Sequence, residues 1–151
     1  MHTALSDMAL EPVTQAAQLM ASALRAGHKV IWFGNGGSAT QSQHMAAEFV
    51  GRFSKDRRAL ASISLTENMA SITAIANDYA YERIFVRQVE ALAQAGDVAI
   101  GLSTSGSSSN VLAGLRRARE LEVSTIGLCG ASAEKMRPLC HVCIAVPSSE
   151  T

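Results

Sequence analysis

Residues 29–50 read KVIWFGNGGSATQSQHMAAEFV, and this stretch determines how the rest of the chain is interpreted. Residues 29–33 are rich in strand-forming types, which predicts a short buried strand. Gly and Asn dominate residues 34–37, as is typical of a tight turn. Residues 38–50 carry apolar side chains at helical spacing. A strand, a glycine-rich turn and a helix in this order predict one β–α unit.

The same alternation continues along the chain. Strand-like runs follow at residues 59–65, 97–103, 123–129 and 141–146, and helix-like runs occur at residues 11–26, 67–76, 81–94 and 109–121. Apolar strands that alternate with helices favour a parallel sheet covered on both faces. We therefore expect an α/β fold, with a doubly wound, five-stranded parallel sheet flanked by helices in a flavodoxin-like topology. The 151 residues suit a single domain.

The amino-acid composition limits the kinds of partner that the chain is expected to bind. The thirteen basic and thirteen acidic residues balance each other. The chain therefore has no overall positive electrostatic potential that would attract nucleic acid or an anionic membrane. We expect no membrane span and no signal peptide, because no long apolar stretch occurs. Three cysteines do not make a disulfide framework and fit a reducing cytoplasm. Cys140 and Cys143 have the spacing of half a zinc knuckle, but on one strand they would point to opposite faces, which favours a structural role.

Two loops follow predicted strands and precede predicted helices, where ligands of parallel sheets gather. The glycine loop, residues 34–38, is either a tight turn or a place where a sugar or phosphate approaches the backbone. The serine loop, residues 103–110, reads STSGSSSN. Its hydroxyls stand at a helix start, where free N–H groups favour an anion. The alternative is a serine-rich loop with an ordinary helix cap.

His44 and Glu48 lie four residues apart and share one helix face. They form either a surface pair or, if that face overhangs the pocket, a metal-binding or proton-transferring pair. Asn77 and Asp78 interrupt two helical runs and serve as a turn or as a polar wall of the pocket.

The segments GNGGSATQSQHMAAEFVGRF, AIANDYAYE and GDVAIGLSTSGSSSNVLAGLRRA resemble the sugar-isomerase (SIS) fold, and within it the phosphoheptose isomerase family. The resemblance covers residues 13–147. It implies conversion of sedoheptulose 7-phosphate to D-glycero-D-manno-heptose 7-phosphate, an early step toward ADP-heptose and lipopolysaccharide core. It implies sugar contacts by Asn35, Gly36 and Gly37, phosphate contacts by Ser103, Thr104, Ser105 and Ser108, and a pocket lined by Asn77 and Asp78. His44 and Glu48 match two zinc ligands, and Glu48 also matches the catalytic base.

The family's remaining zinc ligands, a Gln and a His, belong to a C-terminal helix after the last strand. The sequence ends before such a helix, so we expect it to be shorter than the natural protein. The resemblance also implies a cytoplasmic homotetramer with pockets between subunits. Two other functions stay open: a non-catalytic SIS regulator that binds a phosphosugar or a replication initiator, and an isomerase of another ketose phosphate.

Overall fold

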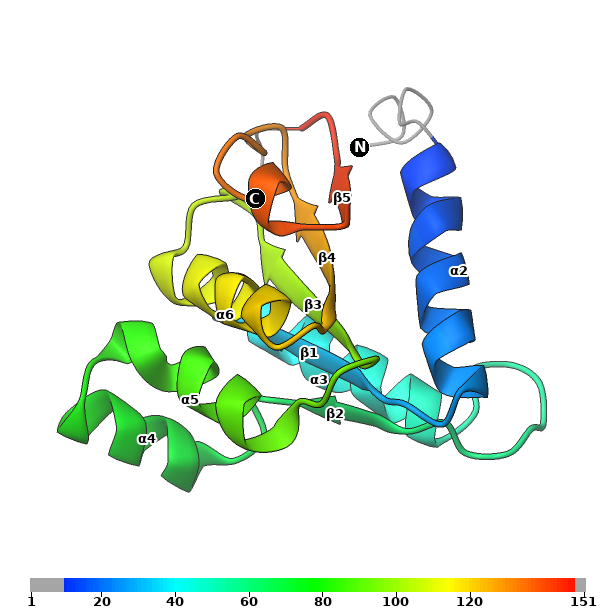
Figure 1. Cartoon of the computed structure of the whole chain (residues 1–151), viewed down its shortest axis with the longest axis horizontal. Helices are drawn as coiled ribbons and strands as arrows, with labels where there is room; N and C mark the ends of the chain where they lie inside the picture. Colours follow the sequence, from blue (N-terminus) through cyan, green and yellow to red (C-terminus); the bar gives the residue numbers. More distant parts are fainter. Residues whose placement is uncertain (1–9, 149–151) are drawn as a thin grey trace.

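The computed structural model describes residues 10–148, which contain a five-stranded parallel sheet in the order β2-β1-β3-β4-β5 (Figure 1). Its strands are β1 (Val30–Gly34), β2 (Ser62–Ser64), β3 (Val98–Ser103), β4 (Ser124–Cys129) and β5 (Val142–Ala145). This is the doubly wound order that the sequence predicts. The order reverses at β1 and β3, so ligands are expected beyond the carboxyl ends of these strands.

Helices connect the strands at nearly the predicted positions. They are α2 (Glu11–Arg25), α3 (Gly37–Val50), α4 (Met69–Asp78), α5 (Ile84–Leu92) and α6 (Ser109–Glu120). The predicted helix over residues 81–94 divides into a 3-10 turn, η1 (Tyr81–Arg83), and α5, and a second 3-10 turn, η2 (Arg137–Leu139), precedes β5. Within residues 10–148, no helix is long and apolar enough to cross a membrane.

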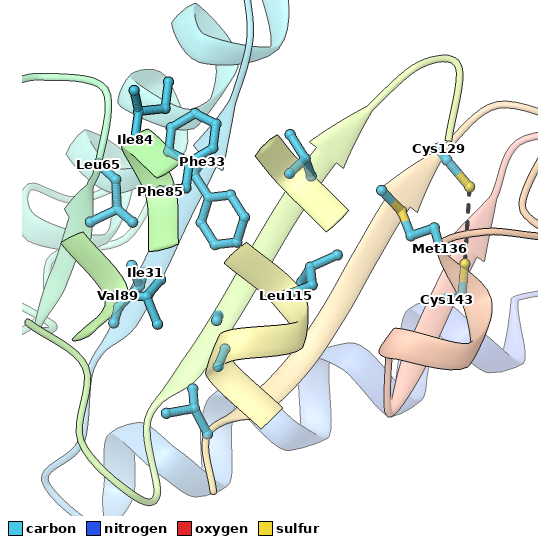
Figure 2. Close-up of a cluster of buried hydrophobic side chains, with 14 of the residues drawn as sticks. Ile31, Phe33, Leu65, Ile84, Phe85, Val89, Leu115, Cys129, Met136 and Cys143 are labelled. Atoms are coloured by element: carbon cyan, nitrogen blue, oxygen red, sulfur yellow. Dashed lines mark hydrogen bonds between the residues drawn. The ribbon is translucent and has the colours of Figure 1, made fainter. Parts of the chain in front are cut away.

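Successive residues of β1 point to opposite faces of the sheet and build two cores. Val30 and Trp32 join the cluster that contains residues of α2 and α3. Ile31 and Phe33 join the larger cluster under α5 and α6, where the Phe33 and Phe85 rings lie 5.1 Å apart (Figure 2). Figure 1 places α2 on one side of the sheet and α4, α5 and α6 on the other. Burial on both faces explains why the strands read as continuous apolar runs.

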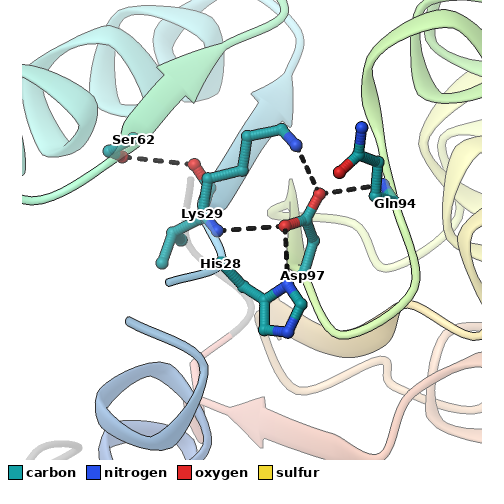
Figure 3. Close-up of polar contacts among 6 residues, drawn as sticks. His28, Lys29, Ser62, Gln94 and Asp97 are labelled. Carbon is teal, nitrogen blue, oxygen red and sulfur yellow. Dashed lines mark hydrogen bonds and ion pairs between the residues drawn. The ribbon is translucent and has the colours of Figure 1, made fainter. Parts of the chain in front are cut away.

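Asp97 joins the amino ends of β1 and β3 (Figure 3). Its side chain is buried and accepts hydrogen bonds from the Lys29 backbone N–H at 3.0 Å, the Lys29 ammonium at 2.6 Å and the Gln94 backbone N–H at 2.9 Å. His28 Nδ1 lies 3.8 Å from the same carboxylate. One charged side chain therefore satisfies two backbone donors where the strands begin.

The cysteines lie together on one side of the sheet, which corrects the prediction for Cys140 and Cys143. β5 begins at Val142, so Cys140 belongs to the preceding turn and is free of the strand's alternation. A Cβ on Gly127 would meet Cys140 Sγ at 2.7 Å, and Gly127 is the register partner of Cys143. Cys129 Sγ lies 4.0 Å from Cys143 Sγ (Figure 2). All three are free cysteines, in keeping with a structural role.

His141 makes folding stability depend on pH. Its Nδ1 accepts a hydrogen bond from the Thr125 N–H at 2.9 Å, between β4 and β5. Burial, and secondarily the charge of Arg119, lowers the pKa of His141 below its ordinary value of 6.5. The unfolded chain therefore binds a proton at a higher pH than the folded chain, so stability falls as pH drops below about 6.5.

We expect His141→Gln to reduce the fall in Tm between pH 7.5 and pH 5.5, because Gln has no proton to gain in this range. Thermal unfolding of both proteins at the two pH values measures the difference. An unchanged pH dependence in the variant would contradict this assignment.

Candidate active site

The glycine loop and the serine loop lie side by side at the carboxyl edge of the sheet. β1 and β3 are neighbours, with Gly34 in register with Leu102, so the chain enters both loops at the same level. The Asn35 and Asn110 amides exchange two hydrogen bonds of 2.8 Å, one in each direction, between the end of β1 and the start of α6. Two loops that are distant in sequence, each following a predicted strand, therefore lie next to each other at the carboxyl ends of the strands.

Two glycines near these loops allow close approach of backbone segments, Gly34 to β3 and Gly106 to the loop that follows β4. A Cβ on Gly34 would stand 2.9 Å from the Leu102 carbonyl oxygen. Gly106 has φ +63°, and a Cβ there would stand 1.8 Å from the Ser132 carbonyl oxygen. Both collisions involve backbone atoms, which cannot rotate away, so an alanine at either position would displace its loop.

The hydroxyls of the serine loop converge at the start of α6. Ser103 is buried, and its Oγ lies 2.9 Å from Ser108 Oγ and 3.4 Å from Ser105 Oγ. Ser108 occupies the N-cap position of α6, yet its side chain makes no capping bond. The first-turn N–H groups of this helix are thus not capped by that hydroxyl, as an anion site requires. Thr104 and Ser105 are exposed beside them.

A cavity of about 310 Å³ opens between the two loops. Its lining includes Ser38 and Gln41 from α3, Ser103 and Thr104 from the serine loop, Cys129 at the end of β4 and Gly130 directly after it. A hydrogen bond with Cys143, followed by burial, raises the pKa of Cys129 above its ordinary value. The Cys129 thiol therefore holds its proton more strongly than an ordinary cysteine does.

We expect Gly106→Ala to weaken binding of inorganic phosphate by roughly tenfold to a hundredfold, because the new methyl group must move the loop by about an ångström. Isothermal titration with phosphate measures the change. Gly27→Ala is the matched control: φ is +88° there, but nothing lies within 4 Å of the new Cβ. Gly27→Ala therefore imposes a similar backbone strain far from the serine loop. Equal phosphate affinities of Gly27→Ala and Gly106→Ala would contradict the prediction.

The structure places His44 and Glu48 away from these loops. Glu48 lies eleven residues after Gly37, about 16 Å along the helix axis. The neighbouring Phe49 carbonyl accepts a hydrogen bond from the Leu60 N–H, just before the start of β2, so this end of α3 lies beside the amino ends of the strands. The prediction that the His44/Glu48 face overhangs the serine-loop pocket of its own chain is therefore wrong. A helix that returns antiparallel to its strand carries its last turns away from the loop that begins it.

His44 and Glu48 instead line a second cavity, of about 490 Å³, together with Met45, Phe49, Phe53, Arg57 and Leu60. The Arg57 guanidinium donates to the carbonyls of Glu48 and Phe49 at 2.7 and 2.9 Å, which stabilises the end of α3. Glu48 is 29% exposed and His44 is 63% exposed, so both side chains can reach a ligand.

The His44/Glu48 pair fits two positions of a zinc site. His44 Nε2 and Glu48 Oε1 are 3.7 Å apart. Two ligand atoms bound tetrahedrally at about 2.0–2.1 Å from one zinc ion lie roughly 3.4 Å apart, so a small side-chain adjustment would suffice. Among residues 10–148, no third His, Cys, Asp or Glu completes a cluster with them. If zinc binds here, its further ligands would lie outside this cluster of residues 10–148.

Asn77 and Asp78 are exposed at the end of α4, where the Asn77 amide donates to the Asp78 carboxylate at 2.8 Å. The segment after them reaches the site, because the Tyr81 hydroxyl donates to Asn35 Oδ1 at 2.9 Å. Sequence reasoning overlooked both Tyr81 and Asn110. Asn110 ends the serine-loop motif, and its polar side chain before an apolar helical face was the available signal.

Comparison with known proteins identifies the family of this chain. A family model described as SIS domain matches residues 2–130. The phosphoheptose isomerase of Aquifex aeolicus is 48% identical over 148 residues, covering 98% of this chain and 78% of the relative. The structure of phosphoheptose isomerase from Neisseria gonorrhoeae has a TM-score of 0.90 at 39% identity, covering 99% of this chain and 79% of that one. The Francisella tularensis structure has a TM-score of 0.91 at 33% identity, covering 98% and 78%. The chain therefore belongs to the phosphoheptose isomerase family of SIS-domain proteins.

Proposed function

We propose that this chain is a ketose–aldose isomerase that converts sedoheptulose 7-phosphate to D-glycero-D-manno-heptose 7-phosphate. The observation that carries the proposal is the serine loop. Ser103 and Thr104 line a cavity without a basic side chain in its lining, and the Ser108 side chain makes no capping bond at the adjacent start of α6. Such a site suits the phosphate of a sugar. The family relationship identifies the reaction.

The reaction moves a carbonyl group from C2 to C1 through an enediol. A base removes a proton from C1, the hydroxyl proton of C1 passes to the oxygen on C2, and a proton returns to C2. Glu48 is our proposed base, since a carboxylate can take the C1 proton and return it. Phosphate held in the serine loop fixes the sugar's position, and Asn35, Gly36 and Gly37 would contact it near the glycine loop. A zinc ion held by His44 and Glu48 would stabilise charge on the enediol oxygens.

In this proposal, the two halves of the site come from different copies of the chain. About 16 Å of α3 separates Glu48 from the glycine loop, which is longer than an extended seven-carbon sugar phosphate. Phe53 is 80% exposed and Val50 is 52% exposed beside the Glu48 cavity, as expected of a surface that another subunit covers. The homotetramer implied by family resemblance would supply that subunit.

Family resemblance also supports a role in ADP-heptose and lipopolysaccharide core synthesis in the cytoplasm. The non-catalytic regulator is not favoured, because relatives at 48% identity over nearly the whole chain are isomerases. A binding module would also have no need of a carboxylate at position 48.

The decisive experiment incubates the protein with sedoheptulose 7-phosphate, with and without added zinc, and follows formation of the aldose by NMR. We expect turnover that a chelator lowers. Binding of phosphosugar without any aldose product under either condition would support the regulator instead. Fructose 6-phosphate, measured in parallel, tests the isomerase of another ketose phosphate.

A further inference from the structure

Asn35 is held by side chains from two other elements. Its Nδ2 donates to Asn110 Oδ1 at 2.8 Å, and its Oδ1 accepts from Asn110 Nδ2 at 2.8 Å and from the Tyr81 hydroxyl at 2.9 Å. Asn110 lies in the first turn of α6 and is 2% exposed, whereas Tyr81 lies in η1 and is 57% exposed. A buried amide and an exposed phenol therefore meet on one loop residue.

A backbone group determines which way these amides face. The Val111 N–H donates to Asn110 Oδ1 at 2.9 Å, and a backbone N–H can only donate. The oxygen of Asn110 must therefore face Val111 and Asn35 Nδ2, which leaves its Nδ2 facing Asn35 Oδ1. Flipping either amide would place two N–H groups or two oxygens against each other in a partly buried position.

This orientation leaves Asn35 one side-chain group to offer a ligand. Both lone pairs of its Oδ1 are used by Asn110 and Tyr81, and one hydrogen of its Nδ2 is used by Asn110. The second Nδ2 hydrogen remains, so this side chain can act toward a ligand only as a donor. We propose that Asn110 is a positioning residue that presents Asn35 as a hydrogen-bond donor to a sugar oxygen of the phosphosugar substrate, with Tyr81 occupying the remaining acceptor site.

The proposal rests on the isomerase function, and a double-mutant cycle tests it. Asn110→Ser removes the amide but keeps a hydroxyl that suits a helix start. Loss of a donor that binds the substrate and the transition state equally raises KM and leaves kcat nearly unchanged. We expect the KM for sedoheptulose 7-phosphate to rise about tenfold, with kcat within about threefold and inhibition by inorganic phosphate unchanged.

In an Asn35→Ala background, Asn110→Ser should change KM by less than about twofold, since it acts only through Asn35. Tyr81→Phe, which leaves the Asn35–Asn110 pair intact, should raise KM less than Asn110→Ser does. An equal effect of Asn110→Ser in both backgrounds would overturn the proposal. So would a parallel loss of phosphate inhibition, because that reports damage to the serine loop.

A spectroscopic measurement separates this proposal from the isomerase function. In the ¹⁵N-labelled protein without substrate, the Asn35 side-chain amide signals, identified by their absence in Asn35→Ala, should shift in Asn110→Ser. Unshifted signals overturn the proposed orientation even if the enzyme is active. Shifted signals in a protein that turns over no ketose phosphate would support the orientation and leave the isomerase function refuted.

Discussion

Glu48→Gln is expected to lower kcat for sedoheptulose 7-phosphate by about 10²–10⁴-fold, the usual contribution of a general base. Gln has nearly the same shape but cannot take a proton from C1. Phosphate affinity should stay unchanged, because the serine loop lies at the carboxyl ends of the strands and residue 48 lies near their amino ends. Steady-state kinetics and phosphate titration of the same preparation measure the two effects.

Mixing variants tests whether one site draws on two copies. Gly106→Ala, with a damaged serine loop, and Glu48→Gln should each be impaired alone. After denaturation and refolding together in equal amounts, about a quarter of the sites would combine an intact loop from one chain with an intact Glu48 from another. Activity near that level would support shared sites. No gain over the separately refolded variants would rule out the two-copy arrangement, and undiminished activity of Glu48→Gln would remove Glu48 as the base.

Asp97→Asn is expected to destabilise the fold by about 3 kcal/mol, the largest stability effect we predict. The carboxylate accepts from the Lys29 N–H, the Lys29 ammonium and the Gln94 N–H (Figure 3). An amide would place its own N–H against one of these donors and would leave the ammonium without its counter-charge. The two strand starts would then lose their common acceptor.

Thermal unfolding measures this effect, and we expect Tm to fall by roughly 6–12 °C for a chain of this size. Glu90→Gln is the matched control, with the same chemical change. Glu90 pairs with Arg117 Nε at 3.1 Å, but the two side chains are about one-third exposed, at 33% and 34%. The control should change stability by about 0–1 kcal/mol. Similar losses in the two variants would mean that burial of Asp97 is not the source of the effect.

The candidate site was predictable where it follows from local patterns. The glycine and serine loops each join a strand to a helix, and the carboxyl ends of adjacent parallel strands meet at one edge. Asn110 and Tyr81 were not identified, because their hydrogen bonds to Asn35 span 75 and 46 residues and leave no trace in local spacing. The cysteine prediction failed for a related reason: it assumed that Cys140 belonged to the strand, whereas β5 begins two residues later.

The sequence alone determined the type of fold, the five strands and the two strand-to-helix loops that we propose contact the substrate. Alternation of apolar strands with helices and the glycine and serine turns are local signals, and backbone stereochemistry translates them directly. Only the tertiary structure decided where the His44/Glu48 face lies relative to the serine loop. Because α3 returns antiparallel to β1, its His44/Glu48 face lies at the amino end of the sheet, while the serine loop lies at the carboxyl end. Helical spacing shows which residues share a face, but the distance between that face and another loop depends on how the elements pack.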